Sequence, residues 1–266
     1  MLKDKVAVIY GAGGGIGGAA ARAFASEGAR VFLAGRRLAA VEVVAKDVVS
    51  AGGSAEAAQV DALDEQSLDG HLQAVVAKAG RVDVSFNAVG IASLYDAGIL
   101  GVPLTDLAAR HFTLPVTTLV NSYFLTARLA ARHMIPNRSG VIMTVTALHS
   151  RTGIPLVGGY GPAQAAKEAL TRDLSAELAP QGIRVVGLRP HAMPETPTFQ
   201  DAFEQGGAKA SGMTWEQWQE VLASRTHTRR LMTLEETTNM AVFMASDKAA
   251  GMTGTTVNLT MGSLDD

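Results

Sequence analysis

The sequence predicts an α/β fold with a doubly wound, seven-stranded parallel sheet and helices on both faces. Short apolar runs alternate along the chain with longer stretches of helical periodicity, as in successive βαβ units. The short runs are apolar throughout rather than at every second residue, which is typical of strands that are covered on both faces. These two observations favour a sheet that lies between two layers of helices.

The first strand is expected at 5–10, where "KVAVIY" runs into a glycine-rich turn. An amphipathic helix at 16–27 and the apolar run "RVFLA" at 30–34 complete a first βαβ unit. The same alternation then continues to the end of the chain. Further strands are expected at 55–60, 82–87, 140–146, 183–188 and 256–260, and further helices at 38–51, 64–79, 105–134, 158–179 and 234–245.

The whole chain, 1–266, is expected to form one domain, because no repeat, low-complexity tract or linker divides it. One irregular segment interrupts the alternation, and it is predicted to be a lid-like insertion at about 191–232. Long irregular insertions in compact domains are often functional. The alternative is a surface excursion in which Trp215 and Trp218 pack a small helix.

Composition narrows the class of partner. Lys and Arg total 23 against 25 Asp and Glu, and the net charge of −2 gives no reason to expect nucleic acid or an anionic membrane. The absence of cysteine excludes disulfides, thiolate metal sites and a cysteine nucleophile. No apolar run approaches the roughly 18 residues of a membrane span, and the first residues do not resemble a leader peptide. A soluble, cytoplasmic protein that binds a small molecule is expected.

The glycine-rich turn after the first strand is typical of a Rossmann-type dinucleotide-binding unit. Its glycines fit G-x-x-x-G-x-G at Gly11, Gly15 and Gly17, or G-x-G-x-x-G from Gly13. The first register is preferred because it places its leading glycine directly after the strand. Glycines here, with Ile16, bring backbone N–H groups to a pyrophosphate at the helix N-terminus.

The end of the second strand predicts which dinucleotide is bound. There "AGRR" places Arg36 and Arg37 where related folds carry either an acid for the ribose diol or an arginine for a 2′-phosphate. Guanidinium groups suit a phosphate, so NADP(H) is preferred over NAD(H). The alternative is a pair of solvated arginines at the start of a helix.

With these motifs the chain resembles the short-chain dehydrogenase/reductase family over essentially its full length. "YGAGGGIG" is similar to the family's T-G-x-x-x-G-I-G, with Tyr10 in place of threonine. The resemblance implies that Asn87 and Gly90 of "VDVSFNAVG" lie at the adenosine ribose and that Asp61 meets the adenine. It also implies an oligomer, either a dimer or a homotetramer, and no metal.

The segment "GLRPHAMPETP" resembles the family's stretch that closes on the nicotinamide, with Pro190 kept and His191 in place of a glycine. Family members react through a serine, a tyrosine and a lysine, supported by an asparagine. The resemblance assigns Tyr160 to the tyrosine and Asn121 to the asparagine. Four residues after the tyrosine stands Gln164, which can bind a ribose hydroxyl but carries no charge.

Thirteen residues before the tyrosine stands Ala147 instead of serine. Candidates to replace the missing donor are His149 and Ser150, in the loop after the fifth strand, and His191. The adjacent Thr146 is expected to face the wrong way. Each histidine has the alternative role of a loop residue bonded to backbone or water. Lys167 shares the helical face of the tyrosine but lies two turns away.

The expected function is an NADP(H)-dependent oxidoreductase that reduces a carbonyl or similar group on a small, fairly apolar substrate. Tyr160 is the expected proton donor, Asn121 its support and His149 a further catalytic group. Two alternatives stay open. The chain could bind NADP(H) without turnover in a regulatory role, or it could catalyse a non-redox dehydration, isomerisation or cyclisation on the same fold.

Overall fold

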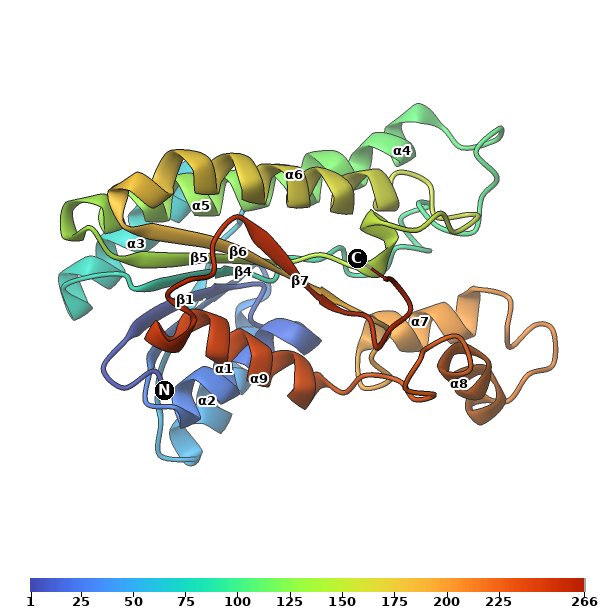
Figure 1. The fold of residues 1–266 in the computed structure, drawn as a ribbon, viewed down its shortest axis with the longest axis horizontal. Coiled ribbons are helices and arrows are strands. Elements are labelled where there is room, and N and C mark those ends of the chain that lie inside the picture. The colour runs from blue at the N-terminus through green and yellow to red at the C-terminus, as the bar shows by residue number, and fades with distance from the viewer. Residues whose placement is uncertain (266) are drawn as a thin grey trace.

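The computed structural model, which describes residues 1–265, contains the expected seven-stranded parallel sheet (Figure 1). The strand order is β3-β2-β1-β4-β5-β6-β7, and every neighbouring pair is parallel. The order reverses between β1 and β4, where folds of this kind bind their ligands. The strands are β1 Val6–Tyr10, β2 Arg30–Gly35, β3 Ser54–Gln59, β4 Val84–Asn87, β5 Gly140–Val145, β6 Ile183–Pro190 and β7 Thr255–Leu259.

Helices cover both faces of the sheet, as predicted. One layer holds α1, α2 and α9, and the other holds α3, α5 and α6 (Figure 1). These helices are α1 Gly15–Ser26, α2 Leu38–Ser50, α3 Glu65–Ala79, α5 Asn121–Met134, α6 Tyr160–Leu178 and α9 Leu234–Ala245. Short 3₁₀ turns follow several elements: η2 Ile135–Asn137, η3 Leu148–Ser150, η4 Ala179–Gln181 and η5 Asp247–Ala249.

The continuously apolar strands serve two cores at once. In β1, Ala7 and Ile9 pack in the cluster beneath α1, α2 and α9, while Val6, Val8 and Tyr10 pack in the cluster beneath α3 and α5. Successive side chains of a strand point to opposite faces, so each face needs its own apolar set. This double burial is why the strands were recognisable as unbroken apolar runs.

The long helix expected at 105–134 is present from Ala109 onward, but it is not α-helical throughout. The chain instead forms α4 Ala109–Pro115, a π-helical turn η1 Val116–Val120, and then α5. A π-turn hydrogen-bonds from residue i to i+5 and therefore holds more residues than an α-turn. It rotates the faces of the helix that follows, so the side chains on α5 do not point where an unbroken helix would place them.

The irregular segment folds into two further helices, α7 Pro197–Gln205 and α8 Trp215–Ala223 (Figure 1). Four aromatic rings hold them together, with centroids 4.4–5.8 Å apart. These rings belong to Phe199 and Phe203 of α7 and to Trp215 and Trp218 of α8. The two tryptophans therefore pack a small helix, as the second interpretation of this segment expected.

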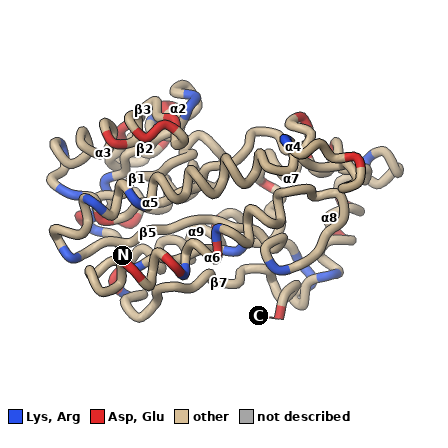
Figure 2. The backbone as a smooth tube through the Cα atoms, turned by 90° about the horizontal axis from the view of Figure 1, so that it is seen from above, with Lys and Arg blue, Asp and Glu red and all other residues tan. Residues whose placement is uncertain are grey.

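The described residues contain no helix with the length and hydropathy of a membrane span. Figure 2 shows Lys and Arg interspersed with Asp and Glu along the backbone, without a broad face of one sign. Such a surface agrees with the small net charge of −2.

Candidate functional site

The segments singled out in the sequence meet at one edge of the sheet. Because all seven strands are parallel, their carboxyl ends share an edge. There the glycine-rich turn follows β1 and the two arginines follow β2. Asn87 ends β4, His149 follows β5, and His191 follows β6. The crevice of such a sheet lies at this edge, so the candidate site is built from loops that distant parts of the chain contribute.

The glycine-rich turn is too tight for side chains at three positions, one of which is Gly13, where a Cβ would lie 2.9 Å from Ala40 Cβ; the other two would collide with backbone. Gly11 has a φ of +74°, and a Cβ there would lie 2.5 Å from the Ala88 carbonyl oxygen. A Cβ on Gly17 would lie 2.4 Å from the Gly11 carbonyl oxygen. Both positions therefore require glycine, which agrees with the register that begins at Gly11.

The N-terminus of α1 can hold an anion. Its N-cap residue, Gly14, offers no side chain to the first N–H groups of the helix, which have no intrahelical partner. The amides of Gly15, Ile16 and Gly17 thus lie at the positive end of the helix dipole. A turn that side chains cannot enter, next to an uncapped helix start, fits a pyrophosphate.

The start of α7 lies over this turn. A Cβ on Gly15 would lie 3.4 Å from Pro197 Cδ and 3.5 Å from Thr196 Cγ2. The Thr196 hydroxyl donates to the Met193 carbonyl at 2.8 Å, and Thr196 is buried. The insertion therefore borders the expected phosphate site, which is the position a lid would need.

Arg36 and Arg37 are both exposed at the end of β2. Within residues 1–265 neither guanidinium makes an ion pair. The backbone is fixed nonetheless, since Gln59 Nε2 donates to the Arg36 carbonyl at 3.2 Å and Arg37 is the N-cap residue of α2. Two positive charges are thus presented on an anchored segment.

The remaining residues that the resemblance assigned to the cofactor lie along the same edge. Asn87 is buried, and its Nδ2 donates to Thr126 Oγ1 at 3.0 Å. A Cβ on Gly90 would meet no atom within 4 Å, so this backbone borders open space. Asp61 accepts from the Leu63 amide at 3.0 Å, and Pro190 ends β6 opposite Leu259.

Tyr160 is the first residue of α6, and two side chains flank its ring. The His149 ring meets it edge to face, with centroids 5.2 Å apart and planes at 80°. Gln164, one turn further along α6, is buried and its side chain lies at the hydroxyl. Burial raises the pKa of Tyr160, and a hydrogen bond from Gln164 only partly opposes this. The phenol is therefore protonated at neutral pH.

His149 and His191 are largely buried and close enough to influence each other. Burial, together with repulsion from His191, lowers the pKa of His149 to about 4. Burial also lowers the pKa of His191. Each Nδ1 is buried, and neither has a hydrogen-bond partner among the described residues. Both rings are neutral at pH 7, and a neutral imidazole has one nitrogen that donates and one that accepts.

The other candidate donors point elsewhere. Thr146 Oγ1 donates to Glu168 Oε1 at 3.1 Å, away from Tyr160 as expected, and Ser150 Oγ donates to the same oxygen at 2.5 Å. Lys167 is buried, and its ammonium donates to the Val145 carbonyl. Burial lowers the pKa of Lys167 to about 7. Of the candidates near Ala147, the structure brings only His149 to the tyrosine.

Asn121 is exposed at the start of α5, and no hydrogen bond within residues 1–265 joins it to Tyr160, so its support of the tyrosine stays a prediction. The π-helical turn before it packs against α6, and its buried side chain is Leu119, which is 2% exposed. A hydrocarbon side chain occupies the buried position instead.

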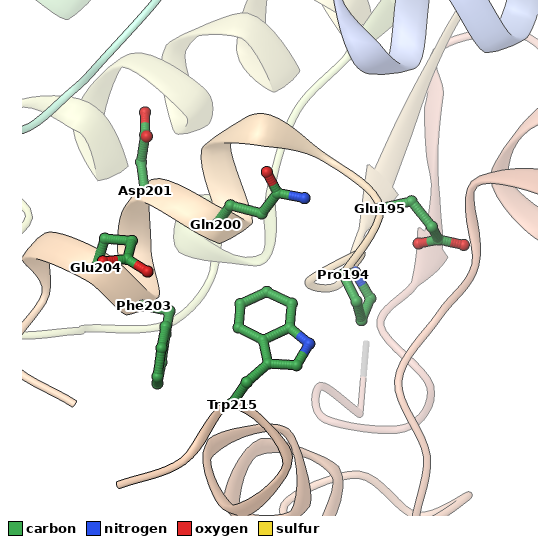
Figure 3. Close-up of a pocket in the computed structure, with 7 residues that line it drawn as sticks. All are labelled: Pro194, Glu195, Gln200, Asp201, Phe203, Glu204 and Trp215. Atoms are coloured by element: carbon green, nitrogen blue, oxygen red, sulfur yellow. The ribbon is translucent and has the colours of Figure 1, made fainter. Parts of the chain in front are cut away.

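A groove of about 650 Å³ lies between α7 and α8 (Figure 3). Its lining residues are Pro194, Glu195, Gln200, Asp201, Phe203, Glu204 and Trp215. A second groove, of about 370 Å³, adjoins it and shares Pro194 and Glu195. Neither is lined by Tyr160 or by the two histidines. Both grooves lie at the insertion, whereas Tyr160 and the two histidines lie at the carboxyl edge of the sheet.

Comparison with known proteins places the chain in a family of oxidoreductases. Residues 11–263 match a family model described as enoyl-(acyl carrier protein) reductase. The 7α-hydroxysteroid dehydrogenase of Escherichia coli K12 is 29% identical over 265 residues, covering 100% of this chain and 96% of that protein. The putative ketoacyl reductase of the monensin polyketide synthase, from Streptomyces virginiae, is 31% identical over 261 residues and 97% of both chains.

A solved 7α-hydroxysteroid dehydrogenase in complex with NADH and 7-oxo glycochenodeoxycholic acid superimposes with a TM-score of 0.84. It is 28% identical, and the match covers 100% of this chain and 96% of that one. The fold of this chain thus also occurs in a protein that was solved with a nicotinamide cofactor bound.

Proposed function

The chain belongs to the short-chain dehydrogenase/reductase family and is an oxidoreductase of that type, and from this premise we propose that it is an NADP(H)-dependent carbonyl reductase. One observation carries the proposal. Tyr160 presents a protonated phenol, with the His149 ring and the Gln164 side chain against it, at the edge of the sheet where the glycine-rich turn lies.

The preference for NADP(H) rests on Arg36 and Arg37. They are exposed and form no ion pair within residues 1–265, and no acid stands beside them to repel a 2′-phosphate. A guanidinium holds a phosphate through charge-assisted, often bidentate hydrogen bonds. The first-turn amides of α1 would hold the pyrophosphate, and the bound cofactor supplies the hydride.

The rest of the cofactor would lie along the same edge. Asp61 would meet the adenine, and Asn87 with Gly90 would line the adenosine ribose. Gln164 would bind the nicotinamide ribose, and Pro190 would close on the ring. All five lie beyond the carboxyl ends of strands or on α6, where folds of this kind bind dinucleotides.

Tyr160 would donate the proton to the carbonyl oxygen. Its raised pKa suits reduction, which consumes a phenolic proton, and does not suit oxidation, which needs the phenolate as a base. Gln164 carries no charge and cannot lower that pKa as the lysine of the family does. The enzyme is therefore biased toward making alcohols.

His149 would supply the second donor to the oxygen. Ala147 has no hydroxyl, and the neutral His149 ring lies against the tyrosine with one ring nitrogen available to donate. A donor aimed at a developing oxyanion is typically worth 10²–10³ in rate. The relatives named as a hydroxysteroid dehydrogenase and a ketoacyl reductase support a ketone on a largely apolar skeleton as the substrate.

The test is a fluorescence titration of the purified protein with NADPH and NADH, followed by an assay of NADPH oxidation with ketones of increasing apolar size. Tight NADPH binding and oxidation that depends on a ketone would support the proposal. NADPH binding without turnover would favour a cofactor-binding protein in a regulatory role. Binding of neither nucleotide would refute the proposed function.

A further inference from the structure

One buried carboxylate ties together three segments of the site. Glu168 lies on α6, and its side chain and that of Arg189 are each 3% exposed. Arg189 Nε donates to Glu168 Oε1 at 2.8 Å, and Arg189 Nη2 donates to Oε2 at 2.9 Å. Ser150 Oγ donates to Oε1 at 2.5 Å, and Arg151 Nε donates to Oε2 at 3.2 Å. Thr146 Oγ1, at the end of β5, donates to Oε1 at 3.1 Å.

These donors flank the two histidines. Ser150 and Arg151 directly follow His149 in η3, and Arg189 stands two residues before His191 at the end of β6. Glu168 itself lies on the helix that begins with Tyr160. A single side chain therefore joins the segments that carry all three rings of the candidate site.

The electrostatics show that this carboxylate is ionised. Burial alone would raise the pKa of Glu168, but the hydrogen bonds from Arg189 and Ser150 outweigh it and leave the pKa lowered. A buried ion pair gives little net stability over apolar packing, whereas loss of one partner leaves an uncompensated charge. The pair of Glu168 and Arg189 is therefore better suited to fixing the positions of the segments around it than to stabilising the core. Five donor atoms hold the Glu168 carboxylate in place.

We propose that Glu168 is the positioning residue that holds the His149 ring against Tyr160 and His191 beside them, through its hydrogen bonds to Ser150 and Arg189. The inference rests on the proposed function of this same site. Glu168 does not touch the reacting atoms and acts through the segments that it anchors. If the η3 segment were released, the His149 ring would leave its buried position, regain solvent and titrate as an ordinary histidine.

The test uses Ser150→Ala, which removes one anchor of η3 and leaves the pair of Glu168 with Arg189 intact. The matched control is Ser175→Ala. Ser175 is a buried serine on the same helix as Glu168, and its hydroxyl bonds Thr253 Oγ1 at 2.7 Å, away from η3. Both variants lose one hydroxyl that is hydrogen-bonded within the protein, so a general effect of losing such a bond would appear in both.

The first readout is the titration of His149 by NMR in the full chain, with its resonance assigned by loss in His149→Asn. The wild-type ring should stay neutral down to about pH 4. In Ser150→Ala it should titrate closer to the ordinary value of about 6.5. The groups that influence this ring are Tyr160, which it contacts, His191, and the charges of Glu168 and Arg151 next to its segment.

The second readout is steady-state reduction of a ketone by NADPH. Ser150→Ala should lower kcat by roughly 10²-fold, the cost of a small misplacement of a catalytic group, with NADPH affinity and Tm close to those of Ser175→Ala. Ser150→Thr keeps a hydroxyl and should restore both readouts. Glu168→Gln should shift the His149 titration and lower kcat by more than Ser150→Ala does. If Glu168→Gln does not fold, the result for Ser150→Ala alone tests the positioning role.

The outcomes separate this inference from the proposed function. A His149 titration in Ser150→Ala that matches wild type and Ser175→Ala would overturn the positioning role, whatever the activity. A shifted titration with a matching loss of kcat supports it. A shifted titration in a protein that reduces no ketone would support the positioning role and refute the proposed function alone.

Discussion

The rings of His149 and Tyr160 meet edge to face, with centroids 5.2 Å apart and an interplanar angle of 80°. An edge-to-face pair places the polarised rim of one ring against the π-face of the other, and here it packs a histidine against the proposed proton donor. Both groups are uncharged at neutral pH because burial raises the pKa of Tyr160 and lowers that of His149 to about 4. Under the proposed function, the groups that would donate to the substrate are therefore neutral.

Replacing the tyrosine should separate chemistry from binding. Tyr160→Phe keeps the ring that His149 contacts and removes the proton. Ketone reduction should fall by at least about 100-fold, while the NADPH dissociation constant changes little, because the glycine-rich turn and the arginines are untouched. Stopped-flow reduction and a fluorescence titration would measure the two quantities. Unchanged turnover would rule out Tyr160 as the donor.

The two arginines should decide between the nucleotides. Arg36→Ala and Arg37→Ala should each weaken NADPH binding by about tenfold or more, since a hydrogen bond to a charged group contributes about 1.5–3 kcal/mol. NADH binding should not weaken, because NADH lacks the 2′-phosphate. Arg132→Ala, at an exposed arginine on α5, is the matched control. An equal loss of affinity for NADPH and NADH would show that the arginines do not bind the 2′-phosphate.

Introducing the serine and lysine typical of the family should raise the rates of ketone reduction and of alcohol oxidation. In the double variant Gln164→Lys with Ala147→Ser, an ammonium one turn from Tyr160 would lower its pKa, and a hydroxyl would stand at position 147. Turnover with generic ketones should rise, and alcohol oxidation should gain more because it needs the phenolate. Gln164→Met with Ala147→Ser tests whether the charge is responsible. No gain in either direction would indicate a pocket shaped for other chemistry.

The buried Lys167 should make stability depend on pH. Its pKa is about 7 in the folded chain and 10.5 for the exposed side chain, so between these values the unfolded state binds more protons. The free energy of unfolding should then rise with pH, by up to about 1.4 kcal/mol per unit. Urea denaturation of wild type and Lys167→Met at pH 7, 8 and 9 would measure this. Equal slopes in the two proteins would contradict the prediction.

The parallel sheet could be predicted because burial on both faces leaves an unbroken apolar run at its inner strands, such as β1 and β5. The glycine-rich turn was also recognisable, since Gly11 and Gly17 sit where any side chain would collide with backbone. The π-helical turn at Val116–Val120 was not, because one extra residue leaves little trace in an apolar pattern. The sequence therefore did not show that Asn121 would lie exposed directly after this turn.

The carboxylate at Glu168 was also missed, although the sequence holds a signal for it. Arg189 stands inside the apolar run of β6, and a charge in a buried strand needs a partner of opposite sign. The sequence does not show which of the many acids is that partner, because the answer depends on how α6 lies across the sheet. The contact between His149 and Tyr160 escaped prediction for the same reason, since the loop between them has no periodic pattern.

The contact of Thr196 and Pro197 with Gly15 limits how this protein could acquire new substrates. Under the proposed function, the start of α7 borders the site of the cofactor phosphates, so substitutions there should alter cofactor exchange together with substrate choice. Helix α8 attaches to α7 through aromatic rings and lies further along the insertion. Substitutions that change substrate preference without changing nucleotide binding should therefore lie in α8 and its flanking loops. The residues at the start of α7 should vary less.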